Sequence, residues 1–204
     1  MKDLSYQAVV DESCILDYSS HYSDRWYVAF VRTGHEREAF RDVNIAYGGE
    51  DISAFLPSIE MPFKKAGAVH KENHLMFPGY VFFSSSMAED EFIQEINGFI
   101  RKSKHALRLL QYGASGQAAL YDYERKVLED LWDESTQRIE MSRGILKGNQ
   151  LVITQGPLTG RENKVVKIDR HSMKATTEIV LFGETRTVTV GVEIAEKFQV
   201  DYQI

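Results

Sequence analysis

The sequence predicts a mixed α/β sandwich (α+β or α/β) that a linker joins to a small all-β barrel. Two observations lead to this fold class. Over roughly the first two thirds of the chain, runs rich in aromatic and β-branched residues alternate with segments of helical periodicity, the pattern of helices packed against a sheet. Beyond residue 147, short β-rich runs punctuated by glycine follow one another, as in small barrels.

The length and composition are those of a globular protein with one large or two small domains. The 204 residues are 43% hydrophobic and 26% charged, enough to build a modest core in each of two domains. The single cysteine, Cys14, excludes an intrachain disulfide and fits a reducing compartment. No apolar run approaches the roughly 18 residues of a membrane span, and the N-terminus lacks a signal-peptide pattern. We therefore expect a cytoplasmic protein.

The first elements follow an acidic, serine-rich segment over residues 1–24, which we expect to be a poorly ordered extension. The run 26–31 is rich in aromatic and β-branched residues and predicts a strand. Thr33 and Glu36 then have the spacing of a capping box, which predicts a helix over 34–47. Two glycines at 48–49 end this helix.

A second strand is predicted over 54–59, with Pro57 near its end, followed by a basic hairpin over 61–74 whose tip is at Gly67. The hydrophobic stretch 75–83 comes next. Successive side chains of a strand face opposite ways, so this stretch has two hydrophobic faces. Either the strand is buried in a sandwich, or its second, surplus face awaits a partner.

We assign Val81 and Phe83 to the core and Tyr80 and Phe82 to the surplus face. Because proline belongs at a sheet edge or a bulge, a bulge at Pro78-Gly79 would bring Phe77 onto the same surplus face.

The remaining elements divide the chain into domains. Helices are predicted over 89–97 and 121–132, with a strand over 106–112 between them. The predicted barrel strands are 150–154, 163–168, 176–182 and 186–190. The expected boundaries are an extension over 1–24, a first domain over 25–133, a linker over 134–147 and a second domain over 148–204.

The net charge of −6 argues against general affinity for phosphate backbones, but basic residues gather locally. No acidic residue occurs from Ile96 to Tyr121, where Arg101, Lys102, Lys104 and Arg108 stand close together. Such a cluster indicates either a nucleic-acid contact or an ordinary solvated face.

Four motifs of the first domain carry a family resemblance: Trp26-Tyr-Val-Ala-Phe30, Thr33-Gly-His-Glu36, Phe77-Pro-Gly-Tyr-Val-Phe82 and Tyr112-Gly-Ala-Ser115. Together they resemble the N-terminal (NGN) domain of NusG-type transcription elongation factors. The stretches 151–160, 164–171 and 181–183 resemble the SH3-like KOW domain that follows it in that family. Over about 25–198, both domains match in the family's order and spacing.

The resemblance implies a transcription elongation factor whose first domain binds the clamp helices of RNA polymerase through an aromatic surface. Carried over by motif, that surface comprises Phe30, Phe77, Pro78, Tyr80 and Phe82. Phe182 matches the partner-binding loop of the KOW domain, for which termination factor Rho and a small-subunit ribosomal protein are alternative partners. Burial in the barrel core is the competing role of Phe182.

Within the family, Ile168-Asp-Arg-His171 and the body of the KOW segment are most similar to LoaP-type antiterminators, and Tyr112-Gly-Ala-Ser115 is shared with RfaH. Specialised members act on selected operons through a nucleic-acid signal, either leader RNA or non-template DNA. The candidate residues for this contact are Arg32, His35, Arg37, Lys64, Lys65, Lys71, Arg101, Lys102 and Lys104. For the hairpin lysines, contact with another polymerase element is the competing interpretation.

Two other functions stay open: a housekeeping NusG-like factor, and a ribosome- or RNA-binding KOW protein that acts apart from polymerase. An enzyme is not expected, because no phosphate-loop, dinucleotide or nucleophile-elbow motif occurs. The six histidines lack a metal-binding arrangement, so we expect no metal and no cofactor. We also expect a monomer and no membrane partner. The β-branched density of 175–192 predicts a stable barrel that does not pack on the first domain.

Overall fold

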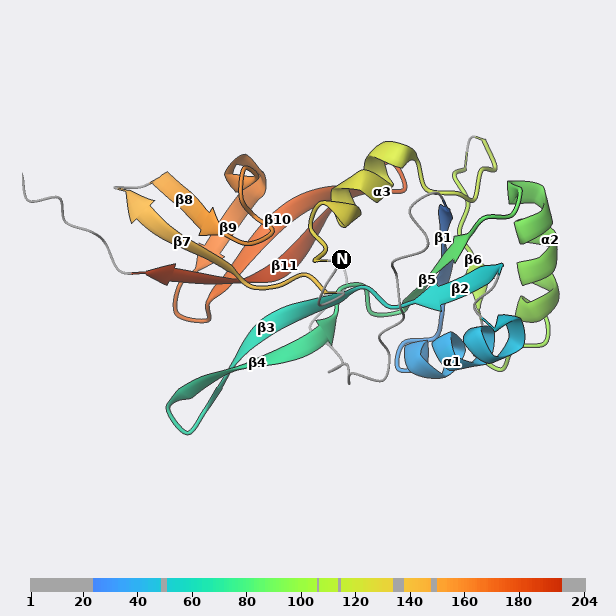
Figure 1. Cartoon of the computed structure of the whole chain (residues 1–204), viewed down its shortest axis with the longest axis horizontal. Helices are drawn as coiled ribbons and strands as arrows, with labels where there is room; N and C mark the ends of the chain where they lie inside the picture. The colour runs from blue at the N-terminus through green and yellow to red at the C-terminus, as the bar shows by residue number, and fades with distance from the viewer. Residues whose placement is uncertain are drawn as a thin grey trace, which may run out of the picture.

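The computed structural model describes residues 24–48, 51–105, 107–113, 115–133, 138–147 and 150–195. Two sheets lie side by side along the long axis of the molecule, and a long hairpin extends beneath the C-terminal sheet (Figure 1). Of the extension expected over 1–24, only Asp24 falls within the described residues.

The N-terminal module is a four-stranded sheet in the order β2-β5-β1-β6, with two helices on one face. Its elements are β1 (Arg25–Phe30), α1 (Glu36–Tyr47), β2 (Ile52–Phe55), β5 (Tyr80–Ser85), α2 (Glu89–Ile100) and β6 (Arg108–Leu109). The predicted helices against a sheet are therefore confirmed. The strand predicted over 106–112 is shorter, because only two of its residues pair with β1.

Strand β5 has two hydrophobic faces, as its alternation predicts, but the face of Phe82 is buried within the chain and is not left open for a partner. Val81 and Phe83 lie in the core beneath α1 and α2, where Phe92 also packs. Phe82 lies in a second core on the opposite side of the sheet, together with Trp26 and Val28 from β1. Both faces are closed, because Phe82 and Phe83 are each fully buried.

The basic hairpin is present as β3 (Ser58–Lys65) and β4 (Ala68–Leu75). Its two-residue tip, Ala66-Gly67, has positive φ at both positions, the backbone of a tight hairpin turn. The single strand predicted over 54–59 is wrong: β2 ends at Phe55 and β3 begins at Ser58. Pro57 between them has no N–H to donate to a ladder.

The N-terminus of α1 differs from the predicted capping box. The helix begins at Glu36 rather than at residue 34, and His35 occupies the N-cap position without a side-chain cap. Glu36 is instead buried by tertiary contacts. At the other end Gly48 adopts the left-handed conformation and closes the helix, as expected.

The C-terminal module is one five-stranded sheet in the order β8-β7-β11-β10-β9. Its elements are β7 (Ser142–Lys147), β8 (Gln150–Gln155), the short 3-10 helix η2 (Glu162–Lys164), β9 (Val165–Asp169), β10 (Lys174–Leu181) and β11 (Glu184–Ala195). Alternate residues of β10 are buried, and β11 pairs with β10 through its first part and with β7 through its last. The β-branched segment is thus strand, as predicted.

Strand β7 occupies part of the segment expected to be a linker, so that prediction is wrong over 142–147. The residues just before β7 are also paired with the N-terminal module. The N–H of Glu60 donates to the carbonyl of Ile139 at 2.8 Å, and the N–H of Ile139 donates to the carbonyl of Ser58 at 2.9 Å. Residues 134–137 lie outside the described part.

The expectation that the C-terminal module does not pack on the first domain is also wrong. One continuous core joins Phe82 and Trp26 of the first sheet to Ile179, Leu181 and Val190 of the second. The apolar second face of the first sheet supplies the physical reason, since leaving it in water would forgo the free energy of burying large aromatic side chains.

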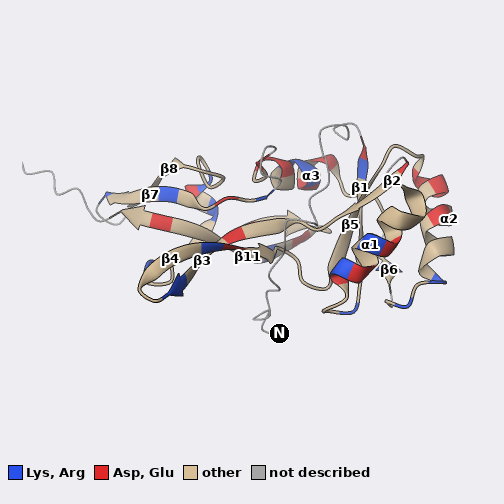
Figure 2. Ribbon diagram, turned by 60° about the horizontal axis from the view of Figure 1, so that its bottom comes forward, with Lys and Arg blue, Asp and Glu red and all other residues tan. Residues whose placement is uncertain are grey.

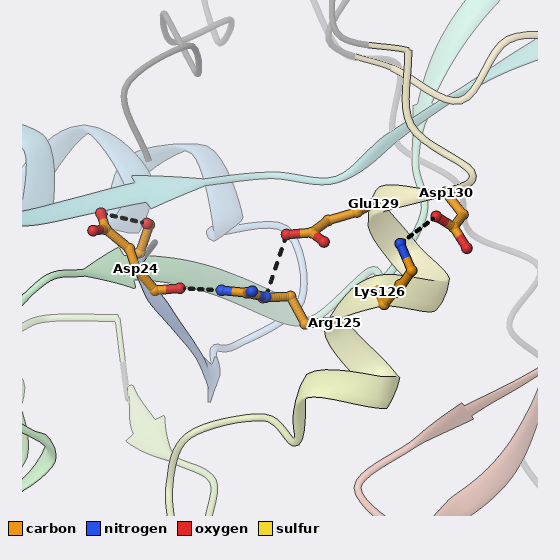
Figure 3. Close-up of polar contacts among 6 residues, drawn as sticks. Asp24, Arg125, Lys126, Glu129 and Asp130 are labelled. Carbon is orange, nitrogen blue, oxygen red and sulfur yellow. Dashed lines mark hydrogen bonds and ion pairs between the residues drawn. The ribbon is translucent and has the colours of Figure 1, made fainter. Parts of the chain in front are cut away.

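Helix α3 (Asp122–Glu129) lies at the junction of the two sheets (Figure 1). It is attached to the first sheet through Arg125, whose guanidinium donates to the backbone carbonyl of Asp24 at 2.5 Å (Figure 3). The same side chain forms an ion pair with Glu129 at 3.3 Å. Lys126, one residue on, makes only an exposed pair with Asp130.

This difference between two neighbouring cations gives a stability prediction. Arg125→Ala should lower the free energy of unfolding by about 1.5–3 kcal/mol, because it removes a charge-assisted hydrogen bond between α3 and Asp24, the residue just before β1. Lys126→Ala, the matched control, should change it by less than about 0.5 kcal/mol. Urea denaturation followed by circular dichroism measures both. Equal effects of the two substitutions would contradict a structural role for Arg125.

Candidate functional site

The residues Phe30, Phe77, Pro78, Tyr80 and Phe82 form one surface, which we call the aromatic face. Phe30 and Tyr80 are register partners on β1 and β5, and their rings meet edge to face with centroids 5.9 Å apart. The ring of Phe77 stacks on that of Phe82 at 5.3 Å. Phe30 is 40% exposed, whereas Phe82 is fully buried, so Phe82 supports the ring of Phe77 from beneath.

A turn before β5, rather than a bulge within it, brings Phe77 onto this face. Gly79 has a φ of 86°, and the N–H of Tyr80 donates to the carbonyl of Phe77. The buried carboxylate of Glu36 holds the turn: it accepts from the N–H of Gly79 at 2.7 Å and from that of Gly34 at 2.8 Å. The start of α1 and the aromatic face therefore share one side chain.

The turn between β10 and β11 covers part of the aromatic face. We call its residues Leu181, Phe182 and Gly183 the C-terminal tip. A cavity of about 20 Å³, room for little more than one water molecule, remains between the two modules. Its lining comprises Val28, Phe77, Tyr80, Phe82, Leu110, Leu181, Phe182 and Arg186.

A buried carboxylate fixes the C-terminal tip in place. Glu124 of α3 is fully buried and accepts from the N–H of Gly183 at 2.8 Å. Its second oxygen accepts from the hydroxyl of Tyr112, whose ring lies 5.2 Å from that of Phe182. Burial and the hydrogen bond to Glu124 raise the pKa of Tyr112, so its hydroxyl stays a donor at neutral pH.

The backbone of Phe182 is unusual for its residue type. Leu181 pairs with Glu184, so Phe182 and Gly183 form a two-residue turn with φ values of 56° and 71°. Such turns favour asparagine or aspartate before glycine, and a bulky residue there costs on the order of 1 kcal/mol or more. The position is compatible with phenylalanine because the ring packs on Tyr112 and the second core. Phe182 is thus partly buried between the modules.

The structure adds residues that the sequence reasoning missed, namely Tyr112, Glu124, Leu110 and Arg186. A single sequence gives little sign of them, since a glutamate in the first turn of a helix is ordinarily a solvated side chain. Phe182-Gly183 did carry a signal: two residues ending in glycine between two β-rich runs predict a tight hairpin.

The predicted basic residues fall into two groups. Arg32 and His35, before α1, lie beside the loop that follows α2: the N–H of Arg32 donates to the carbonyl of His105 at 3.2 Å, and the rings of His35 and His105 are 5.5 Å apart. His105 was not among the predicted residues. We call these residues, together with Arg37 beside His35 in the chain and Arg101, Lys102 and Lys104 just before His105, the cationic surface.

Figure 2 shows basic residues on α1 and beside β6, and others on the β3–β4 hairpin near the opposite end of the molecule. Lys64, Lys65 and Lys71 are therefore not part of the cationic surface. All three are exposed, and Lys71 forms an ion pair with Glu60 at 2.8 Å.

Removal of the Glu124 carboxylate should loosen the C-terminal tip. Glu124→Ala leaves the N–H of Gly183 and the hydroxyl of Tyr112 without their acceptor, at a cost of about 1–3 kcal/mol. Amide hydrogen exchange over 181–183 should therefore become roughly 5- to 150-fold faster. Asp122→Ala, an exposed carboxylate in the same helical turn, should leave this exchange unchanged. Equal protection in both variants would contradict the role of Glu124.

Within the described residues, no helix is long and apolar enough to cross a membrane. The same part of the chain contains no group of three or more His, Cys, Asp or Glu side chains placed to hold a metal ion.

Comparison with known proteins agrees with the geometry of the first sheet. A search of curated proteins found no match. The family model described as transcription termination factor nusG matches residues 24–128, which is just over half of the chain and includes β1 to β6, α1, α2 and most of α3. This match covers the sheet, both helices and every residue of the aromatic face, and the chain therefore belongs to the NusG family.

Proposed function

We propose that this protein is a transcription elongation factor that binds the clamp helices of RNA polymerase through the aromatic face and promotes processive elongation. The observation that carries the proposal is the contact between the exposed ring of Phe30, the last residue of β1, and the half-buried ring of Tyr80, the first residue of β5, within the segment that matches the family. Aromatic anchors of this kind supply much of the binding free energy at protein interfaces.

Binding through the whole aromatic face requires the C-terminal tip to move away. In the docked arrangement Phe182 packs beside Tyr80 and Phe77, so polymerase and the tip would compete for the same rings. A competing internal contact lowers the apparent affinity for polymerase by the fraction of molecules that are undocked. Phe182 then has two roles in this proposal, cover and partner contact.

We infer that the C-terminal sheet is a KOW domain. Its order of strands and its glycine-punctuated loops support this assignment, and the buried alternation of β10 agrees with an SH3-like barrel. Once undocked, Phe182 would be available to termination factor Rho or to a small-subunit ribosomal protein.

The protein is further proposed to be a specialised antiterminator of the LoaP type, acting on selected operons. The cationic surface supports this proposal, because it brings Arg32 and His35 beside His105, the residue that follows Lys104, on a chain of net charge −6. Leader RNA or non-template DNA is its proposed ligand. A housekeeping elongation factor, or a ribosome-associated RNA-binding protein, would use this surface differently.

We propose a binding role rather than an enzymatic one, in the cytoplasm and as a monomer. The clustering of aromatic and cationic side chains on two surfaces supports recognition of macromolecules.

Substitutions on the two sides of the docked contact should change polymerase affinity in opposite directions. Tyr80→Ala should raise the Kd for purified polymerase about 10- to 30-fold, the loss of one aromatic anchor worth roughly 2 kcal/mol. Phe182→Asn should lower the Kd, because asparagine suits the turn but no longer covers the face. Tyr123→Ala, an exposed ring on α3, is the control.

Titration with fluorescently labelled protein measures these affinities, and circular dichroism checks that the variants fold. The proposal fails if Tyr80→Ala binds polymerase like the unsubstituted protein. If Phe182→Asn leaves the Kd unchanged, the C-terminal tip and polymerase do not compete for the aromatic face.

Reversing two charges on the cationic surface should weaken recruitment by nucleic acid. The paired changes Lys102→Glu and Lys104→Glu should reduce the mobility shift of leader RNA or of non-template DNA and flatten its salt dependence. Transcription across a terminator, with and without the upstream leader, supplies the functional readout. Leader-dependent readthrough that the variant loses supports the specialised role, whereas leader-independent suppression of pausing would point to a housekeeping factor.

A further inference from the structure

The β3–β4 hairpin of the N-terminal module touches the β9–β10 turn of the C-terminal sheet. The ammonium group of Lys64 donates to the backbone carbonyl of His171 at 2.8 Å, across 107 residues of sequence. Strand β3 also packs along β11, since a Cβ at Gly191 would lie 2.8 Å from the carbonyl oxygen of Glu60. The two segments therefore form one continuous surface in the docked molecule.

Both segments are cationic. The hairpin carries Lys64, Lys65 and Lys71 over residues 61–71, with no acidic residue. Residues 163–174, around the β9–β10 turn, hold four basic residues against one acidic residue, Asp169, a net charge of +3. The whole chain has a net charge of −6, so this concentration of positive charge is local.

The acidic groups nearby are committed to other partners. Glu60 accepts from Lys71 and from the N–H of Met141, and Asp169 accepts from the N–H of Ser172 within its own turn. Glu72 lies 3.6 Å from His74.

Three cations of this surface, Lys65, Lys167 and Arg170, are exposed and form no ion pair with any described residue. By contrast, Arg125 and Arg161 are each paired with a carboxylate. Cations that lack an internal partner are available to the phosphates of a ligand.

The hairpin adds exposed rings. Phe63, 41% exposed, is the register partner of His70, so their side chains share the face that also bears Lys65. Rings beside lysines are the composition with which proteins hold single strands, since bases stack on the rings while phosphates meet the cations. A flexible single strand can follow both faces of a narrow hairpin, whereas a duplex, which is stiff over about 50 nm, cannot.

We propose that the β3–β4 hairpin and the β9–β10 turn form a single binding surface for the phosphate backbone of a single-stranded nucleic acid, which thus contacts both modules at once. The inference rests on the proposed function for its setting, and the surface belongs to the docked molecule, before polymerase displaces the C-terminal tip. This surface is separate from the cationic surface around Arg32 and His105.

The test is fluorescence anisotropy of the full-length chain with labelled fifteen-nucleotide oligo(U) RNA, oligo(dT) DNA and a DNA duplex of equal length, at several salt concentrations. The hairpin variant carries Lys64→Gln and Lys65→Gln, and the turn variant carries Lys167→Gln and Arg170→Gln. The charge-matched control carries Lys126→Gln and Lys147→Gln, which lie on α3 and β7.

Each of the first two variants should raise the Kd for a single strand about 5-fold or more. Each should also flatten the slope of log K against log salt by about 1.4, the loss of two phosphate contacts on a single strand. The control should stay within about twofold of the unsubstituted protein. Tighter binding of RNA or of DNA identifies the strand, and either supports the proposal.

Unchanged binding by the turn variant would overturn the two-module surface, and duplex binding as tight as single-strand binding would overturn the single-strand assignment. A polymerase titration of the same variants separates this inference from the proposed function. The inference expects both variants to bind polymerase normally. Loss of polymerase binding with oligonucleotide affinity intact would make the hairpin a protein contact and also overturn the inference.

Discussion

Strand β5 imposes the constraint on which the rest of the structure depends. It is the second strand of a four-stranded sheet and is hydrophobic on both faces. A single layer of helices can shield only one of these faces from water. Helices α1 and α2 cover the side of Phe83, and the side of Phe82 needs a second layer, which α3 and the C-terminal sheet provide. Fully burying an aromatic side chain of this size contributes about 1.5–3 kcal/mol, so a few such residues suffice to hold two small modules together.

The C-terminal tip and polymerase, the proposed partner, would contact the same aromatic face. Polymerase would bury rings that the C-terminal tip already buries, so only the difference between the two contacts drives binding. Phe182 holds a left-handed conformation that its side chain disfavours, a strain that the β10–β11 turn imposes whether or not the tip is docked. A tip with asparagine in this place would form the turn more readily but would lack the ring that closes the junction.

Local patterns were sufficient to predict much of the fold. The alternation of Val81, Phe82 and Phe83, the turn at Gly67 and the β-branched residues of β10 and β11 all depend on near neighbours, and the structure agrees with each. The failures involve distant contacts. Thr33 and Glu36 have the spacing of a capping box, but the carboxylate is taken by Gly79, which lies 43 residues further along the chain.

The candidate site was less accessible to sequence reasoning for the same reason. The family resemblance and the two-residue period of the strand together predicted the members of the aromatic face, and these rings do lie together. The docking of the C-terminal tip depends on Glu124, Tyr112 and Gly183, which are far apart in sequence and unremarkable one by one. Proximity of the two histidines at 35 and 105 likewise follows from the fold and from no pattern along the chain.

The double hydrogen bond of Glu36 has a geometric consequence. One carboxylate connects Gly34, between Arg32 and His35 of the cationic surface, to Gly79, inside the aromatic face. The loop before α1 and the turn before β5 are thus tied together through this one side chain. A nucleic acid held at one of them would sit at a set spacing from a polymerase held at the other. The protein would then bind a nucleic-acid signal on the polymerase only where the signal lies at that spacing from the clamp helices.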